Sequence, residues 1–307
     1  MTEAYSDLMR NIKEGKFVFT GELEPEKTTD LTELVESAKK LLGHCVACNV
    51  TDNPQSMAYM SSLVASYVVQ RDAGMECVYQ LRCSDRNSIA LTSDLLGAGA
   101  LGIKNVLALT GDHTTLGDYP GAKPVFDLDS GQLVYLIRKM VDEGVDLYGR
   151  PIHNPPKFHV GVAGNPNADP LESEILKLKR KIDAGAEFIQ TQVIFDIEVA
   201  KTFLKEMERF KVPVLIGIFP LKNYGTADYF DKYIPGVHVP KDLLAEMKKA
   251  SEISDKEKRN ERYDEINLEY YGDFVHEIAH TTSAAGIHVM AVAYERITPA
   301  LIERAKI

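Results

Sequence analysis

Short runs of β-branched and aromatic residues alternate with amphipathic stretches along this chain, and this alternation constrains the fold more than any other feature. A repeated strand and helix is typical of βα units that build a parallel sheet. Eight strand-like runs occur, at 17–23, 45–51, 76–81, 105–110, 157–163, 188–192, 212–218 and 287–292. Eight such units in 307 residues predict an α/β fold of the (β/α)8 TIM-barrel type, which usually takes about 250 residues. A doubly wound open sheet is the alternative.

The stretches between these runs carry apolar residues at helical spacing. The spacing predicts helices near 31–41, 55–73, 86–100, 131–143, 171–184, 197–210 and 225–233. A longer helical region, 241–284, precedes the last run and keeps Tyr263, Ile266, Tyr270, Phe274 and Ile278 on one face. No linker interrupts the pattern. We therefore predict a single domain over residues 1–307 with extra helices before the last strand.

Charge and composition restrict the function. The chain has 35 basic and 45 acidic residues, a net charge of −10 and 45% hydrophobic residues. This is the composition of a globular protein, and its charge is unfavourable for binding nucleic acid. No apolar run is long enough to span a bilayer, and no signal peptide is evident at the start. Four cysteines are too few for a disulfide framework. We expect a cytoplasmic protein without nucleic-acid or membrane partners.

Two motifs suggest sites that the sequence context does not favour. The segment Gly97-Ala-Gly-Ala-Leu-Gly102 matches the dinucleotide fingerprint, but it follows a predicted helix and precedes a predicted strand, the reverse of the order that phosphate binding needs. We interpret it as a helix end. Cys45 and Cys48 are three apart on a predicted strand, so their thiols should point to opposite faces, and no second pair completes a tetrahedral site. We predict buried cysteines and no metal site.

Polar residues stand where the predicted strands end, which is where a barrel of this type places its chemistry. They are Glu22, Thr51-Asp52-Asn53, Gln80, Arg82, Thr110-Gly111-Asp112, Ala163-Gly164-Asn165, Gln192 and, shortly after the seventh run, Tyr224. Asp112 alone can be an ordinary turn residue, and Tyr224 a loop aromatic. Glu22 lies in an apolar strand, so it must face a polar cavity or keep its proton. Gln190 and Gln192 share a strand face and need partners inside a barrel.

Four segments together resemble one enzyme family. They are Gly-Glu22-Leu-Glu-Pro-Glu-Lys-Thr, Thr-Gly-Asp112 after an apolar strand, Leu178-Lys-Arg-Lys-Ile-Asp-Ala-Gly-Ala186 followed by Gln-Thr-Gln192, and Gly217-Ile-Phe-Pro-Leu-Lys-Asn-Tyr224. In this order, at these strand ends, they resemble methylenetetrahydrofolate reductase from about residue 17 to 295. The resemblance implies a (β/α)8 barrel, a non-covalent flavin (FAD or FMN) and a folate substrate in one-carbon metabolism, as in methionine biosynthesis or acetogenesis.

The resemblance also implies roles for individual residues. Glu22 would be the general acid that opens the folate ring to an iminium cation, and Asp112 would stabilise that cation. Gln192, Gln80 and Tyr224 would contact the substrate. Reduced flavin would deliver hydride to give methyltetrahydrofolate. The flavin would be held by Thr51, Gly111, Asp112, Ser130, Ala163, Asn165, Arg180 and Lys181, the two cations facing phosphate.

Several positions depart from the family pattern. Residues 163–169 lack the Tyr and His of the usual Ala-Gly-Tyr-Pro-Glu-x-His, Thr110 replaces an Arg, Gln80 a His, and residues 290–293 a Tyr-Thr-Leu-Asn. FAD and FMN therefore both stay open. Electrons would come from NAD(P)H or from a cysteine-rich, metal-containing partner subunit, as in some anaerobic members. We also expect an oligomer and no fused regulatory domain.

Two other functions remain as alternatives. A pterin-dependent methyltransferase would use a similar barrel without flavin, so a colourless protein would favour it. A non-catalytic folate-binding subunit would have little use for the proton donor Glu22. The presence of Glu22, Asp112 and Gln192 together favours the reductase.

Overall fold

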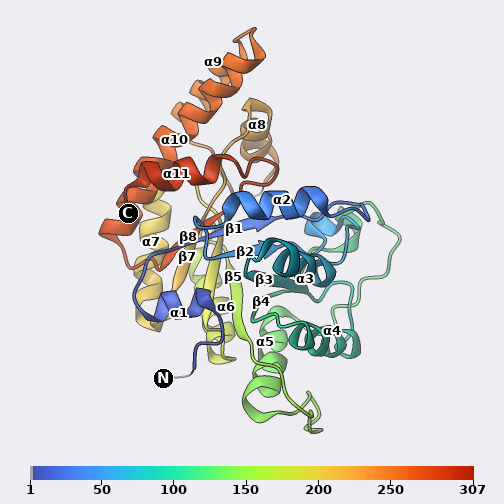
Figure 1. Cartoon of the computed structure of the whole chain (residues 1–307). Helices are drawn as coiled ribbons and strands as arrows, with labels where there is room; N and C mark the ends of the chain where they lie inside the picture. Colours follow the sequence, from blue (N-terminus) through green and yellow to red (C-terminus); the bar gives the residue numbers. More distant parts are fainter. Residues whose placement is uncertain (1–2, 235) are drawn as a thin grey trace.

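The eight strands form a closed barrel in a computed structural model, which describes residues 3–234 and 236–307 (Figure 1). Each strand pairs in parallel with the next, and β1 pairs with β8. The strands are β1 (Val18–Leu23), β2 (Ala47–Val50), β3 (Cys77–Arg82), β4 (Asn105–Leu109), β5 (His159–Gly164), β6 (Phe188–Val193), β7 (Val214–Ile218) and β8 (Gly286–Val289). The predicted TIM barrel is confirmed and the open sheet is wrong.

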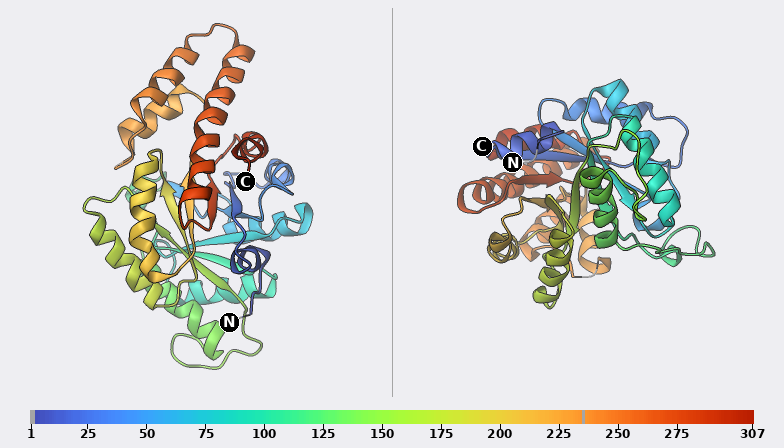
Figure 2. Two further views of the ribbon diagram at one scale, coloured as in Figure 1. Left: turned by 90° about the vertical axis from the view of Figure 1, so that its left-hand side faces the viewer. Right: turned by 90° about the horizontal axis from the view of Figure 1, so that it is seen from below.

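Helices lie around this barrel, as Figure 2 shows from two further sides. The α-helices are α1 (Asp7–Lys13), α2 (Thr32–Leu41), α3 (Ser62–Ala73), α4 (Ser88–Ala100), α5 (Ser130–Arg138), α6 (Leu171–Asp183), α7 (Ile197–Met207), α8 (Tyr224–Tyr233), α9 (Lys241–Ser251), α10 (Lys256–Thr281) and α11 (Ile297–Ala305). Short 3-10 or π turns are η1 (Pro54–Ser56), η2 (Thr114–Leu116), η3 (Lys139–Glu143) and η4 (Glu208–Phe210). Helices α2 to α10 were predicted. Helix α1, which precedes the first strand, and α11, which follows the last one, were not.

Helix α1 lies against the end of the barrel at which the strands begin. Its first turn is bound by Glu76, whose carboxylate accepts hydrogen bonds from the backbone N–H groups of Asp7 and Leu8 at 2.7 and 3.0 Å. A carboxylate at a helix N-terminus satisfies N–H groups that have no partner within the helix. Leu8 and Met9 are buried in a small cluster with inward-facing residues of the strands, including Phe188 and Leu215. An apolar layer therefore fills this end of the barrel.

Helices α9 and α10 are the predicted extra helices before the last strand, and α9 with part of α10 projects beyond the barrel (Figures 1 and 2). The buried Asn267 of α10 donates to the carbonyl of Leu221 at 2.9 Å and accepts from its N–H at 2.6 Å. Tyr271 donates its hydroxyl to the carbonyl of Phe219 at 2.8 Å. Helix α10 therefore holds the segment that leaves β7.

The two rejected motifs behave largely as predicted. Gly97 and Gly99 lie in the last turns of α4, and Gly102, with a φ of +80°, ends that helix before β4. The glycine motif is thus a helix end. Cys45 and Cys48 are buried, and burial raises the pKa of the Cys45 thiol to about 12. The argument from opposite strand faces was wrong, however. Cys45 precedes β2, and both sulfur atoms lie within 3.6 Å of the position that a Cβ on Gly21 would take.

Close packing inside the barrel predicts a large effect of adding one methyl group. A Cβ on Gly161 of β5 would lie 2.2 Å from the ring of the buried Phe188. We expect Gly161→Ala to lower the free energy of unfolding by about 1–3 kcal/mol or more, because overpacking a core forces strain. Gly121→Ala is the control, since nothing lies within 4 Å of its Cβ. Urea unfolding of both variants measures the difference, and equal stabilities would contradict this packing.

Candidate active site

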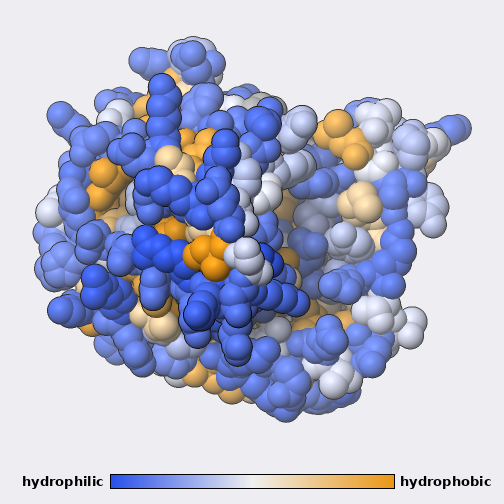
Figure 3. All heavy atoms as spheres, turned by 90° about the horizontal axis from the view of Figure 1, so that it is seen from above, coloured by the Kyte–Doolittle hydropathy of each residue, from blue (hydrophilic) through white to orange (hydrophobic). Residues whose placement is uncertain are grey.

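Three adjoining cavities form a groove at the end of the barrel where the strands finish. The first, about 270 Å³, contains Glu22, Gln80, Asp112 and Gln192, and the second, about 300 Å³, shares Asp112 and Gln192 with it. The third, about 550 Å³, shares Ser130 and Lys181 with the second. Figure 3 shows that the surface seen from above is hollowed and mostly hydrophilic around the hollow. We call these three cavities together the mouth groove.

The mouth groove collects nearly all the predicted site residues. They are Glu22, Thr51, Gln80, Gly111, Asp112, Ser130, Ala163, Asn165, Arg180, Lys181 and Gln192. They come from the ends of β1 to β6 and from α5 and α6, so up to 170 positions separate them in the chain. Closure of the barrel brings them to one rim.

A buried polar network lies inside the barrel below the groove. Gln190 exchanges amide hydrogen bonds with Asn49, at 2.7 and 3.0 Å, and also donates to the hydroxyl of Thr20 at 3.2 Å. His288 places Nδ1 3.0 Å from the same hydroxyl. All four side chains are buried. The prediction that Gln190 needs partners is therefore confirmed, and its partners come from β1 and β2.

Glu22 joins this network to the groove. Its Oε2 lies 3.3 Å from Gln80 Nε2 and 3.3 Å from His288 Nε2, and its side chain is only 14% exposed. Glu22 thus faces a polar cavity, as its position in an apolar strand predicted. His288 was not among the predicted site residues. Its only signal was a His in an otherwise apolar last strand, Gly-Ile-His-Val.

Asp112 differs from Glu22 in its surroundings. It follows β4 in an exposed loop, directly after Gly111, whose φ is +85°. Within the described chain no group donates a hydrogen bond to its carboxylate, but its backbone carbonyl accepts one from the hydroxyl of Ser56 at 2.9 Å. The carboxylate is therefore free to meet a ligand in the groove.

The loop after β2 is strained and tightly held. Asn53, Gln55 and Ser56 all have left-handed backbones, with φ values of 46°, 52° and 56°. None of them is a glycine, so each costs roughly 1 kcal/mol or more. The buried Arg82 binds this loop through one nitrogen, donating to the Asn53 carbonyl at 2.8 Å and to the Ser56 hydroxyl at 3.1 Å. Such strain persists only where the surrounding contacts enforce it.

One buried atom of the groove lacks a partner and therefore suits a ligand. The hydroxyl of Thr51 is buried and, among the described residues, has no hydrogen-bond partner. An unsatisfied buried hydroxyl costs about 1–3 kcal/mol, which a bound polar ring could recover. The far end of the groove offers Ser130 at the first turn of α5 together with Lys181, whose Nζ donates to the Ala163 carbonyl at 2.9 Å. Burial lowers the pKa of Lys181. These residues fit a flavin with its phosphate at that end.

Three predicted residues are less enclosed than expected. Gln192 is exposed at the rim, because a register shift between Gln190 and Val193 carries it beyond the barrel interior, so the expectation of an interior partner was wrong for it. Arg180 is exposed beside Lys181. Tyr224 lies outside the mouth groove. It begins α8, packs partly against the core and donates its hydroxyl to Asp228 at 3.3 Å.

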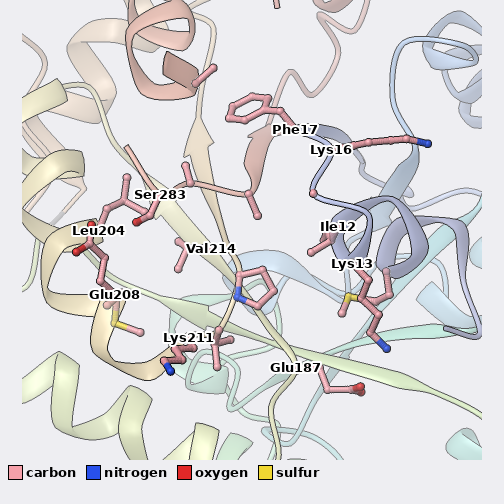
Figure 4. Close-up of a pocket in the computed structure, with 18 residues that line it drawn as sticks. Ile12, Lys13, Lys16, Phe17, Glu187, Leu204, Glu208, Lys211, Val214 and Ser283 are labelled. Atoms are coloured by element: carbon pink, nitrogen blue, oxygen red, sulfur yellow. The ribbon is translucent and has the colours of Figure 1, made fainter. Parts of the chain in front are cut away.

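Another cavity, of about 740 Å³, lies at the opposite end of the barrel between α1 and α7. Figure 4 shows Lys13 and Lys16 on one side of it and Lys211 on the other. It contains none of the predicted site residues, and an apolar floor with scattered charges offers no constellation for chemistry.

Metal sites and membrane-spanning helices are both absent from the described residues. Over residues 3–234 and 236–307, no three His, Cys, Asp or Glu side chains are grouped to hold a metal ion. In the same ranges, none of the helices has the length and apolar character needed to cross a bilayer.

An acidic pocket that contains Glu24, Glu26 and Glu295 predicts a pH-dependent stability. Burial, with the nearby Glu22 and Glu26, raises the pKa of Glu24 from 4.5 to about 7. The folded protein then binds this proton more tightly than the unfolded chain does. The stabilisation that the proton gives is therefore complete below about pH 4.5 and is lost as the pH rises through about 7. We expect Glu24→Gln to gain stability relative to the wild type as pH rises from about 5 to about 8. Urea unfolding at both pH values measures this gain, and parallel pH dependences would contradict it.

Comparisons with known proteins point to one enzyme family. A family model described as methylenetetrahydrofolate reductase matches residues 7–306. A 5,10-methylenetetrahydrofolate reductase from Pectobacterium carotovorum is 25% identical over 220 residues, which cover 69% of this chain and 66% of that protein. A probable methylenetetrahydrofolate reductase (NADPH) from Caenorhabditis elegans is 25% identical over 64% of this chain. The match spans only 28% of that nematode protein.

Solved structures of the same fold show lower identity. A protein from Clostridium thermocellum, described as binding two copies of 5-methyl-5,6,7,8-tetrahydrofolic acid, superposes with a TM-score of 0.65 at 14% identity, covering 97% of this chain and 98% of its own. An oxaloacetate acetylhydrolase gives a TM-score of 0.50 at 10% identity, covering 99% of this chain and 86% of its own. These likenesses show the barrel fold.

Proposed function

The chain belongs to the methylenetetrahydrofolate reductase family, and from this membership we propose that it reduces 5,10-methylenetetrahydrofolate to 5-methyltetrahydrofolate with a bound flavin. The observation that carries the proposal is the meeting of Glu22, Asp112 and Gln192 in one cavity at the barrel mouth. A protein of the same fold is described as binding 5-methyl-5,6,7,8-tetrahydrofolic acid, the product named here. We further propose that residues 1–307 act as one catalytic domain in the cytoplasm.

Glu22 is the proposed general acid. A carboxyl group that protonates a folate nitrogen must be able to hold a proton near neutral pH and must be shielded from bulk water. The side chain of Glu22 is 14% exposed and has His288 Nε2 and Gln80 Nε2 at 3.3 Å. Gln80 and His288 orient the carboxyl, and His288 links it to the hydroxyl of Thr20.

Asp112, Gln192 and Tyr224 are the other proposed substrate contacts. The exposed carboxylate of Asp112 stands at the same cavity as Glu22 and suits a cationic iminium, since negative charge at a fixed place stabilises developing positive charge. The exposed amide of Gln192 lies at the rim, where it can bind the polar edge of a pterin. Tyr224, outside the groove, would bind the aminobenzoate as that part of the folate extends toward α8.

The proposed flavin occupies the rest of the mouth groove. When bound, the flavin supplies the hydride for the methylene carbon. Thr51, Gly111, Ala163 and Asn165 would bind its ring system, and the buried Thr51 hydroxyl would gain a partner. Ser130, Arg180 and Lys181 would bind phosphate at the far end of the groove. FMN and FAD both contain a phosphate that these three residues would bind, so the proposal covers either.

The proposed source of electrons is NAD(P)H or a cysteine-rich, metal-containing partner subunit in an oligomer. The segment that follows β8 is Met290-Ala-Val-Ala293, and Met290 lines the mouth cavity. This apolar end offers a nicotinamide few polar contacts, which favours the partner subunit.

Replacing the proposed acid separates its role from cofactor binding. We expect Glu22→Gln to lower folate turnover by about 10²–10⁴-fold, the usual contribution of a positioned acid, while leaving reduction of the flavin by an artificial dye nearly unchanged. Stopped-flow spectroscopy of the two half-reactions measures both. The exposed Glu261→Gln of α10 is a matched control. Equal folate turnover in Glu22→Gln and the wild type would remove Glu22 as the acid.

Identification of the bound chromophore tests the cofactor. We expect the purified protein to be yellow and to release FAD or FMN when heated, because the mouth groove fits a ring system and a phosphate. Mass spectrometry of the released compound distinguishes the two flavins. A colourless protein that still binds folate would instead support the alternative function, a flavin-free methyltransferase barrel.

A further inference from the structure

The side chain of Asp112 is placed by its backbone alone. No group in the described ranges holds its exposed carboxylate, so the direction of the carboxylate depends on how firmly residues 111 and 112 are fixed. An electrostatic group acts best when its position needs no rearrangement during the reaction. Contacts to the backbone at Asp112 are therefore the contacts that matter for this residue.

Two neighbouring segments restrict this backbone. The Ser56 hydroxyl donates to the Asp112 carbonyl at 2.9 Å. Gly111 approaches the segment that follows β3 so closely that a Cβ on it would lie 2.5 Å from Ser84 Oγ. We propose that Ser56, held by Arg82, is a positioning residue that sets the place of the Asp112 carboxylate.

Arg82 makes Ser56 a rigid donor. Its Nη1 donates to the Ser56 hydroxyl at 3.1 Å and to the Asn53 carbonyl at 2.8 Å, while Asp85 accepts from its Nη2 at 2.7 Å. Since Arg82 occupies a lone pair of the hydroxyl, the hydroxyl hydrogen is left to point at Asp112. Arg82 and Ser56 are both buried, so neither side chain is free to turn into solvent.

The strained loop keeps Ser56 in place. Ser56 itself is left-handed, with a φ of 56°, and its carbonyl packs against Gly117, where a Cβ would lie 1.8 Å from the oxygen. Asn53 accepts from the Tyr59 N–H at 2.8 Å, which closes the loop on its other side. A strained segment this well enforced beside a candidate active site is a sign of preorganisation.

The catalytic consequence rests on the proposed function, so the experiment has one readout that does not. The first readout is the backbone 15N order parameter of residues 111–113 in the free protein, measured by NMR relaxation. We expect it to fall from about 0.85 to below about 0.6 in Ser56→Ala and Arg82→Lys, because the contact that holds this backbone is lost. Ser62→Ala is the matched control. It removes another buried serine hydroxyl, which donates to the Gln80 carbonyl at 3.1 Å, and should leave the order parameters at 111–113 unchanged.

The second readout is a double-mutant cycle on folate turnover. We expect Ser56→Ala to lower kcat about tenfold with flavin content retained, and to add no further loss to Asp112→Asn. The kcat losses of Ser62→Ala and Asp112→Asn should instead multiply when the two substitutions are combined. Ser56→Gly is the second variant, since it removes the hydroxyl but accepts the left-handed backbone, and it should match Ser56→Ala.

The outcomes separate the inference from the proposed function. Unchanged order parameters at 111–113 in Ser56→Ala overturn the inference whatever the enzyme does. Lowered order parameters together with fully multiplying kcat losses also overturn it, because Ser56 would then act independently of Asp112. Lowered order parameters in a protein that never reduces methylenetetrahydrofolate overturn the proposed function and leave Ser56 as the residue that positions Asp112.

Discussion

Hydrogen bonding between the first and the last strand is the constraint on which the site depends. In the register of β1 with β8, Thr20 lies opposite His288, and in the register of β1 with β2, Glu22 lies opposite Asn49. A ring of parallel strands leaves every strand end at one rim, so residues far apart in the chain become neighbours without any long connection between them. Without the β1 to β8 pairing, Glu22 would lose His288, and the interior network would open to water. Closure of the barrel thus defines the fold and also assembles the candidate site.

The barrel interior divides into two layers with different demands. The layer near α1 is apolar, and Phe188, Leu215 and Val78 fill it with Leu8 of the helix. The layer above it holds the amides of Asn49 and Gln190 with the Thr20 hydroxyl. Burying these polar groups would cost several kcal/mol if they were unpaired, but they form hydrogen bonds with one another. The polar layer therefore gives Glu22 a floor of fixed dipoles instead of mobile water, while the apolar layer supplies the stability.

Much of the fold and the location of the site could be predicted from the sequence, and the exceptions have physical causes. Apolar runs show the strands, because strands buried on both faces need continuous hydrophobicity, and the barrel topology then brings Glu22 and Asp112 together. His288 was missed because its contact with Glu22 joins residues 266 positions apart, which no local pattern reveals. The left-handed residues at 53–56 were missed because none is a glycine, so tertiary contacts alone enforce their conformation. The rim position of Gln192 depends on a register shift that alternation cannot predict.

The two acids of the mouth groove are suited to different tasks because different elements hold them. Glu22 is part of a strand, is 14% exposed and contacts two side chains, so its carboxyl group is oriented and largely shielded from bulk water. Asp112 belongs to a loop, is exposed and is held only through its backbone. Its carboxylate therefore faces solvent, and no side chain of the described residues occupies it. Pairs of carboxyl groups in unequal environments are a general way for one site to combine proton transfer with charge stabilisation. In this barrel the inequality arises from topology. A strand residue inherits the buried network of the interior, whereas a residue beyond the strand end must be fixed by a neighbouring loop, and the loop after β2 performs that task.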